Sequence, residues 1–346
     1  MSSAGHHLWH STAVIVATIA IVGFASWTTL ALWFQAPGGA ALRGLCIAGW
    51  LAFACAALLA LHRGHATVAV VTFAVAFAGV LLWWHSLEPT NDHVWADEVA
   101  RTASGELHGD TMTLHNVRNF DWRSESDYTP RWETRSYDLG KLDSLDLITS
   151  YWSGPAIAHV LVSFGFDDGQ HVVFSVEIRR QKSQKFSEIG GFFKEFELSV
   201  IAADERDVIR VRTNIRGEDD YLYRVRLPLQ DTRMLFLAYV TQANELVRAP
   251  RFYNTVTVNC TTLVYHMMQR IVGRLPFSYR VLLSGYLPGY VYAEGGLDRR
   301  YTLEQLRSFG RITERAKQAD RSEFFSRDIR HGIPPLETEL PAGAPP

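Results

Sequence analysis

Three long apolar stretches near the N-terminus limit what this part of the chain can fold into. They are residues 11–34, 44–61 and 66–84, and none contains a charged side chain. At a rise of about 1.5 Å per residue, a helix of each stretch can cross a hydrocarbon core about 30 Å thick, the second and third only just. We therefore predict three transmembrane helices in a membrane anchor of residues 1–87.

The residues around these stretches bear on their orientation. The first stretch is too long, and too poor in preceding Lys or Arg, to be a cleaved signal peptide, and two further stretches follow it. Arg63 lies in the link between the second and third stretches, whereas no Lys or Arg follows the third until Arg101. Although Arg43 beside the first link weakens this contrast, the positive-inside rule favours a cytoplasmic N-terminus and a large domain outside the cytoplasm.

The remainder of the chain has the composition of a folded, slightly acidic domain. All 36 Asp and Glu residues, and all but two of the 34 Lys and Arg residues, lie beyond the third stretch. This charge balance gives no electrostatic reason to bind nucleic acid, so we exclude that class of partner. Residues 95–332 suffice for one hydrophobic core, and the Pro-rich tail 333–346 is predicted to be disordered.

Alternating apolar residues and turn signals predict an antiparallel sheet in this domain. The clearest hairpin joins residues 159–166 to 171–178 around Asp167-Asp168-Gly169. Other predicted elements are strands at 107–120 and 131–139, a second hairpin of 208–216 with 221–227, and a helix at 231–247. The mixture predicts an α+β domain whose antiparallel sheet packs on helices.

Cys260 is the only cysteine beyond the apolar stretches, so it cannot form a disulfide within the domain. Residues 252–258 before it predict a strand, and residues 263–272 after it repeat with helical periodicity up to Gly273. Asn259 would cap this helix and place Cys260 at its first position, where free N–H groups and the helix dipole favour a thiolate. An inert buried side chain is the alternative, but the placement favours a nucleophile.

The predicted hairpin brings a histidine to a carboxylate. If its turn is centred on Asp168, residues whose numbers sum to 336 face one another, so His159 lies opposite Glu177. Direct cross-strand neighbours have Cβ atoms about 4.5–5.5 Å apart, which allows a hydrogen bond between these side chains. A shift of one residue would put Ile178 opposite His159, so this prediction depends on the register.

A second histidine of the hairpin would lie far from this pair. In the same register His171 faces Gly165, about 20 Å along the strand from His159 at about 3.3 Å per residue. We therefore exclude His171 from the site. His159 alone would more often be a structural histidine, but because Glu177 and Cys260 accompany it, we interpret His159 as a catalytic base.

These three residue types suit thiol catalysis. An imidazole can accept the proton of the thiol, and a carboxylate fixes the imidazole tautomer and favours its cation. Backbone N–H groups at the helix start can stabilise a tetrahedral oxyanion, with Asn259 and Thr261 in oxyanion or supporting roles. The order His, Glu, Cys is the permuted form of the papain-type arrangement. The sequence contains no G-x-S-x-G, H-E-x-x-H or G-x-G-x-x-G motif.

Several short phrases of the sequence carry a resemblance to a known family. They are Asn116–Phe120, Trp132–Arg135, Ala158-His159, Ser175–Arg179, Phe252–Asn254, Asn259–Thr262 and Leu287–Tyr290. Over residues 95–292 the chain resembles the periplasmic domain of the Lnb-type lipoprotein N-acyltransferases. That family is similar to permuted papain-like thiol enzymes such as the NlpC-type peptidases and the lecithin:retinol acyltransferases.

This resemblance implies a reaction and a location. It implies that Cys260 is the nucleophile and His159 the base, that a membrane phospholipid is the acyl donor, and that the N-terminal amine of a lipoprotein is the acceptor. The expected location is the bacterial inner membrane, with several spans and the domain in the periplasm. Members of the family can carry further membrane helices after the domain, whereas this chain has its three apolar stretches before it.

Different function classes remain compatible with these residues. A thiol acyltransferase at the bilayer surface is favoured by the membrane anchor. A cysteine peptidase or amidase acting on envelope peptides or cell wall would use the same residues, and a non-catalytic scaffold with a degenerate site is a third option. Tyr253, Arg179 and Trp152 are the expected substrate contacts.

We expect neither a metal nor a cofactor. His6, His7 and His10 lie close in sequence, but a solvated terminus is the simpler interpretation of this cluster. The acidic turn Gly217–Asp220 lacks the spacing of a calcium loop and is expected to be exposed.

Overall fold

The chain forms two compact units. The computed structural model describes residues 3–336, with side chains described from residue 11 onward. The membrane-helix unit comprises residues 1–90 and 187–195, and the extramembrane unit comprises residues 91–186 and 196–346. Residues 337–346, which make up most of the predicted disordered tail, lie outside the described residues.

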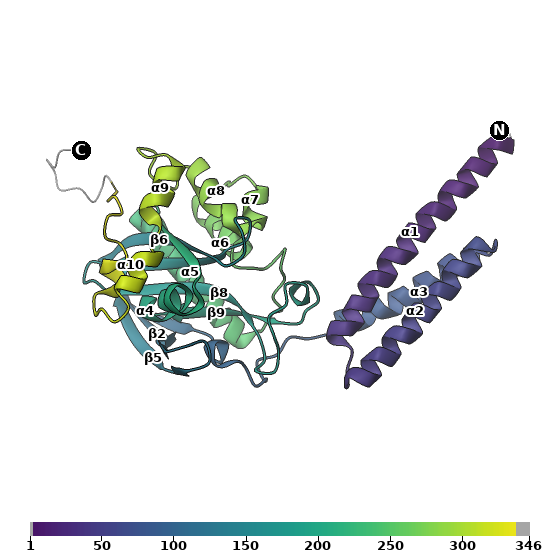
Figure 1. Ribbon diagram of the computed structural model, residues 1–346, viewed down its shortest axis with the longest axis horizontal. Coiled ribbons are helices and arrows are strands. Elements are labelled where there is room, and N and C mark those ends of the chain that lie inside the picture. Colours follow the sequence, from purple (N-terminus) through teal and green to yellow (C-terminus); the bar gives the residue numbers. More distant parts are fainter. Residues whose placement is uncertain (1–2, 337–346) are drawn as a thin grey trace. The chain divides into compact units, whose positions relative to one another are not determined.

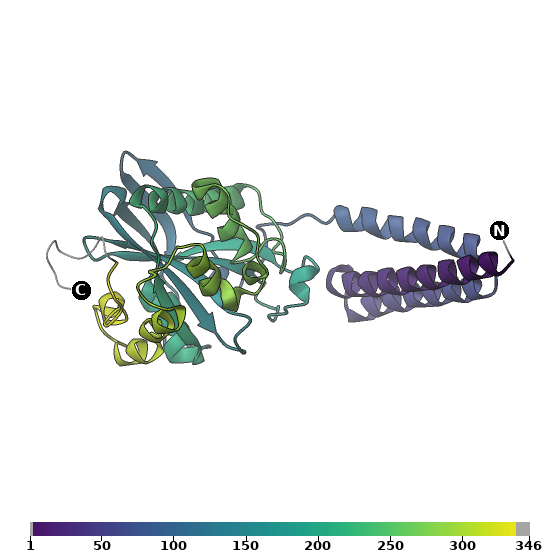
Figure 2. The ribbon, with the colours of Figure 1, turned by 90° about the horizontal axis from the view of Figure 1, so that it is seen from above.

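Three helices make up most of the membrane-helix unit (Figure 1, Figure 2). They are α1 (Ser3–Gln35), α2 (Ala40–His62) and α3 (Ala66–His85). Each is long and apolar enough to cross a membrane, with candidate spans of 25, 23 and 20 residues. Their contacts are rich in small side chains such as Ala25, Ala54 and Ala69, which let helices approach closely. The predicted group of three apolar N-terminal helices is confirmed.

One mixed sheet forms the centre of the extramembrane unit and contains eight strands within the described residues. Seven of them follow the order β1-β2-β9-β8-β7-β6-β10, and the eighth, β5, pairs with β2. They are β1 (Ser104–His108), β2 (Thr111–Arg118), β5 (Trp132–Asp138), β6 (Leu142–Tyr151), β7 (His159–Phe166), β8 (His171–Arg179), β9 (Glu197–Ala203) and β10 (Asp219–Arg224). All neighbours are antiparallel except β2 and β9, which are parallel. A separate short pair consists of β3 (Asp121–Trp122) and β4 (Tyr128–Thr129).

Helices cover both faces of this sheet, as Figure 1 shows for α5 and α10. The longer helices are α5 (Leu229–Arg248) and α6 (Thr262–Val272). The shorter ones are α4 (Glu205–Arg210), α7 (Tyr279–Leu282), α8 (Leu287–Ala293), α9 (Leu303–Gly310), α10 (Thr313–Gln318) and α11 (Phe325–Asp328). Single turns are η1 (Asp97–Val99), η2 (Leu139–Lys141), η3 (Gly190–Phe192) and η5 (Ser284–Tyr286), and η4 (Val211–Arg216) is a π-helix. The α+β class is therefore confirmed.

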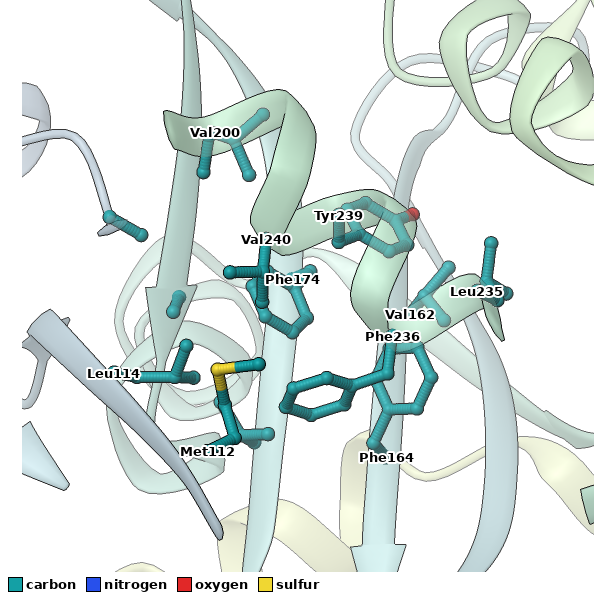
Figure 3. Packing of buried hydrophobic residues seen from close by; sticks show 14 of the residues in the cluster. Met112, Leu114, Val162, Phe164, Phe174, Val200, Leu235, Phe236, Tyr239 and Val240 are labelled. Carbon is teal, nitrogen blue, oxygen red and sulfur yellow. The ribbon is translucent and has the colours of Figure 1, made fainter. Parts of the chain in front are cut away.

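Alternation along the β7–β8 hairpin assigns its side chains to two different cores. Even-numbered residues such as Phe164 and Phe174 pack against Phe236 and Tyr239 of α5, with ring centroids 5.0 Å apart for Phe164 and Phe236 (Figure 3). Odd-numbered Leu161 joins the core under α4, α10 and α11. Each buried large apolar side chain contributes about 1.5–3 kcal/mol to the free energy of unfolding. Burial on both faces of the hairpin therefore determines which residues point to each of the two cores.

The register of the hairpin is the predicted one. Leu161 pairs with Ser175, and Gly165 pairs with His171, so paired numbers sum to 336 throughout the ladder. A one-residue shift would move every buried side chain of the hairpin to the opposite core, which explains why the register is so well specified.

Two predicted strands are wrong. Residues 208–216 are helical, because Asp204 caps α4 through the Arg206 N–H and the chain continues into η4 until Gly217 takes a left-handed conformation. Their β-branched side chains fill the core beneath the sheet instead of a strand position. Residues 252–258 form a turn that returns at Val258 to pair with Asn254, whose side chain accepts the N–H groups of residues 256 and 257.

Candidate active site

The ends of β7 and β8 bring His159 and Glu177 into contact. His159 Nε2 lies 3.1 Å from Glu177 Oε1, and the two side chains are only 13% and 18% exposed. The β7–β8 ladder ends at Leu161 and Ser175, so this pair lies just beyond the regular pairing, where the side chains can lean toward each other. The predicted contact between an imidazole and a carboxylate is thus present.

Ser175 lies between these two groups and was not predicted. Its Oγ lies 2.7 Å from His159 Nε2 and donates a hydrogen bond of 2.6 Å to Glu177 Oε1. A hydroxyl has one proton, so Ser175 can only accept from His159. His159 therefore carries a proton on Nε2, which leaves Nδ1 to take up or release the proton of a nucleophile. A Ser two residues before the Glu on one strand was a signal that could have revealed this residue.

Arg212 is a second group that sequence reasoning missed. It lies in η4, is 6% exposed, and places Nη2 3.2 Å from Glu177 Oε1 and Nη1 3.5 Å from Glu218 Oε2. No local pattern could reveal it, because residues 208–216 were assigned to a strand. Arg212 and His159 contact the same oxygen of Glu177, and it is the packing of η4 that brings the arginine there.

The electrostatics of this cluster favour a charged pair. Burial has the largest single effect and would lower the pKa of His159, as would the charge of Arg212, but the charge of Glu177 together with the hydrogen bonds of Cys260 and Glu177 raises the pKa to about 9. Burial would raise the pKa of Glu177, but His159, Arg212 and Ser175 together hold it well below its usual range. At neutral pH the pair is therefore imidazolium and carboxylate.

A second acidic group lies behind His159, and it corrects the expectation that the acidic turn is exposed. Ser150, the cross-strand partner of His159 on β6, donates to Asp220 Oδ1 at 2.5 Å and also contacts Glu218. Glu218 and Asp220 are 8% and 0% exposed. Burial raises the pKa of Asp220 to about 7, so this carboxyl is partly protonated near neutral pH.

Cys260 occupies the turn that leads into α6. The helix begins at Thr262, so the predicted position of Cys260 in the first helical turn is wrong by two residues. The reason is that Asn259 Oδ1 accepts the N–H groups of both Thr261 and Thr262, which closes a turn before the helix proper begins. Cys260 is half-buried and free, and it contacts the cores on both sides of this turn.

The thiol and the backbone of Cys260 both remain available. Its side chain is close enough to His159 to contribute to the raised pKa of that imidazole. Within the described part of the chain, no acceptor is hydrogen-bonded to the Cys260 N–H. An uncommitted amide at this position is a donor that an oxyanion could use.

Asn259 and Thr261 build the turn and are themselves fully occupied. Asn259 is 6% exposed and donates its Nδ2 to the carbonyl of Thr255. Thr261 is 1% exposed, and its hydroxyl lies 2.6 Å from the carbonyl oxygen of Val281 and 2.8 Å from Asn259 Oδ1, so its one proton serves these two acceptors. The N–H of Thr261 already donates to Asn259 Oδ1, so a supporting role fits these two residues better than direct contact with an oxyanion.

The three expected substrate contacts lie in different surroundings. Arg179 is 6% exposed, stacks on Trp95 at 4.4 Å, and donates to the carbonyls of Val99 and Ala100, so its guanidinium holds the chain before β1. Tyr253 is partly buried against the core under α5 and α6. Trp152 is 46% exposed just after β6, the strand that pairs with the start of β7. The structure thus separates Arg179 from the cluster.

The described residues also bear on the expectation that the protein holds no metal. Among them, no group of three or more His, Cys, Asp or Glu side chains is arranged to hold a metal ion. The side chains of His6, His7 and His10 lie outside the described part.

The fold and these groups define a membrane protein with an α+β domain that carries a buried His–Glu pair beside a free cysteine. Residues 128–285 match the family model described as the Lnb N-terminal periplasmic domain, so this part of the chain is similar to the Lnb-type family. The matched segment contains every residue of the cluster from His159 to Cys260. Neither the curated proteins nor the solved structures gave a match.

Proposed function

We propose that the protein is a thiol acyltransferase of the bacterial inner membrane. In this proposal Cys260 takes an acyl chain from a phospholipid and passes it to an amine, such as that of a lipoprotein N-terminal cysteine. The observation that carries the proposal is the buried contact of 3.1 Å between His159 and Glu177 beside the free thiol of Cys260. The Lnb-type domain and the three apolar helices support a substrate within the membrane.

The first half of the reaction forms a thioester. In the reactive state the proton of the Cys260 thiol lies on His159, which is then an imidazolium, and the thiolate sulfur attacks the carbonyl carbon of the phospholipid ester. The free N–H of Cys260 stabilises the oxyanion that forms on the carbonyl oxygen. The bond between this carbon and the glycerol oxygen then breaks, and His159 returns the proton to that oxygen, releasing a lysophospholipid.

The second half transfers the acyl group. The acceptor amine attacks the thioester carbon, the carbon–sulfur bond breaks, and the proton lost by the amine returns through His159 to the Cys260 sulfur. An amide and a free thiol result, so no external oxidant, reductant or metal enters the balance. Glu177 keeps its charge throughout and stabilises the imidazolium, while Ser175 and Arg212 hold the carboxylate in place.

The arrangement of these residues supports a permuted papain-like domain. The base and acid come from adjacent strands, whereas the nucleophile follows later in the chain, in the turn before α6. With a cytoplasmic N-terminus, three spans would carry the chain out of the cytoplasm just before residue 91, which agrees with a periplasmic domain.

An acyl adduct on Cys260 is the direct test of this function. Protein purified from native membranes should carry an acyl mass on the Cys260 peptide that neutral hydroxylamine removes, as it does for thioesters. Cys260→Ala should lose both the adduct and transfer activity while remaining folded by circular dichroism. Cys55→Ala removes a cysteine of α2 and serves as the matched control, which should keep both.

Two outcomes would contradict the proposal. One is a Cys260→Ala protein that keeps more than about a tenth of the wild-type turnover, since a covalent nucleophile cannot be dispensable. The other is an unmodified Cys260 together with hydrolysis of envelope peptides, which would indicate a cysteine peptidase or amidase.

A further inference from the structure

A short segment inserted in the extramembrane sequence belongs structurally to the membrane helices. Residues 187–195 lie between β8 and β9, yet they form one compact unit with α1, α2 and α3. The chain therefore passes from the strand that carries Ser175 and Glu177 to the membrane-helix unit and then returns to β9.

Aromatic contacts attach this segment to the ends of two spans. Phe193 stacks on Phe34, the penultimate residue of α1, with centroids 5.7 Å apart and planes 13° from parallel. It also meets Trp84, the penultimate residue of α3, at 6.3 Å, and Trp27 of α1 at 6.2 Å. Aromatic side chains of this kind gather where a membrane meets water.

Polar contacts at the same helix ends hold the segment further. Gln35, the last residue of α1, donates its Nε2 to the carbonyls of Phe193 and Lys194, at 2.9 and 2.6 Å. Lys194 Nζ donates to the carbonyl of Trp84 at 2.7 Å and lies 5.0 Å from the centroid of the Trp84 ring. The last carbonyls of a helix lack intrahelical partners, so a lysine here satisfies one of them at the point where a span ends.

The segment also exposes two large apolar side chains, next to the exposed Glu188. Ile189, just before the single turn η3, is 55% exposed, and Phe192, the last residue of η3, is 44% exposed. Glycine is favoured at position 190 because a Cβ there would collide with the Glu195 carboxylate. Phe193 and Lys194 thus fix these exposed apolar side chains near the ends of α1 and α3.

We propose that residues 187–195 form an interfacial anchor that binds the phospholipid surface, with Ile189 and Phe192 inserted among the upper acyl segments of the leaflet. The partner is the lipid bilayer itself, and its recognition is by apolar burial beside an aromatic and cationic boundary. The consequence is that the β8–β9 connection is fixed to the membrane independently of the linker after α3.

Fluorescence quenching by brominated phospholipids tests this placement. Ile189→Cys is made in the full chain with Cys46, Cys55 and Cys260 replaced by Ala, labelled with bimane, and reconstituted into phosphatidylcholine nanodiscs with or without brominated acyl chains. Val75→Cys on the exposed surface of α3 is the membrane control, and Leu107→Cys on exposed β1 is the water control. We expect the label at residue 189 to be quenched about threefold more strongly than the label at residue 107, because only the former meets acyl chains.

Quenching at residue 189 no stronger than at residue 107 would overturn the anchor. The experiment does not depend on acyl transfer, because the labelled chain lacks Cys260 and no turnover is measured. Failure of the anchor would thus leave the proposed reaction untouched, and failure of the reaction would leave this measurement valid.

Discussion

The two ends of the β7–β8 hairpin carry the same three residue types in different arrangements. At the end where β7 begins and β8 finishes, Glu177 contacts His159 at 3.1 Å and Arg212 at 3.2 Å. Here the imidazole is buried and shares the carboxylate with a guanidinium that approaches from another element.

At the turn end of the hairpin the carboxylate is already paired. Glu205 contacts Arg330 at 2.6 Å and accepts a 2.6 Å bond from Ser163, and Arg330 also reaches Asp146 at 2.8 Å. His171 stands over Gly165 and approaches the carbonyl of Gly169 at 3.1 Å, so its imidazole does not contact the Glu205 carboxylate.

The comparison shows that a histidine near a buried carboxylate is not by itself a base. Burial acts to raise the pKa of Glu205, and the charge of Arg330 then lowers it more than any other group does. For Glu177 the largest lowering of the pKa comes from His159. Glu177, unlike Glu205, has an imidazole rather than an arginine as its strongest charged partner, and only the His159 end lies beside a thiol.

The largest expected difference between the two ends is in catalysis. Glu177→Gln keeps the shape of the side chain and removes its charge, so acyl transfer should fall by about 100- to 10,000-fold, the scale seen when the acid of a triad is neutralised. His171→Ala should leave turnover of the folded protein within about twofold. Equal turnover numbers in an assay with labelled phospholipid, or a larger loss for His171→Ala, would reverse the assignment.

The turn end should instead dominate stability. Arg330→Met leaves Glu205 as a buried charge without its guanidinium and leaves Asp146 with Arg224 alone, so the free energy of unfolding should drop by about 3–5 kcal/mol. Lys141→Met is the matched control, since it breaks the exposed pair of Lys141 and Asp168 and should cost about 1 kcal/mol or less. Chemical denaturation followed by far-UV circular dichroism measures both. A loss near zero for Arg330→Met would mean that this end carries no structural charge pair.

The reactivity of the Cys260 thiol is a third property that should distinguish the two ends of the hairpin. His159→Ala removes the proton acceptor beside Cys260, so alkylation of Cys260 by iodoacetamide at neutral pH should slow by about tenfold or more. His171→Ala should alkylate at the wild-type rate. Peptide mass spectrometry resolves Cys260 from the two cysteines of α2. Unchanged rates in both variants would place the base elsewhere.

The smallest expected effect is a change in the pKa of His159. The pKa of His159, about 9 in the folded protein, exceeds the ordinary value of 6.5. Protonation of His159 therefore favours the folded state below about 6.5, and this contribution is lost as the pH rises through about 9. In Glu177→Gln the raising charge is gone while burial remains, so the pKa of His159 should fall. NMR titration of labelled imidazole nitrogens would reveal this, and an unshifted value would exclude Glu177 as its cause.

The sequence predicted the hairpin, its register and the His159–Glu177 contact, because burial on both faces of β7 and β8 leaves one pairing that keeps every apolar side chain inside. It also predicted α5 through its periodicity. It could not predict Arg212, since the β-branched run around it is typical of a strand, and only packing under the sheet and the Asp204 cap make it helical. The start of α6 was missed by two residues because the Asn259 side chain closes a turn ahead of the helix.

The insertion between β8 and β9 also alters how the protein responds to proteolysis. A protease that cut the linker between α3 and β1 would break the peptide connection at residues 86–103, yet residues 187–195 would still hold the domain to α1 and α3 through Phe193, Lys194 and Gln35. Release of the domain would require two further cuts, one on each side of this segment. A single nick would thus leave both fragments in the membrane fraction, associated without a covalent bond.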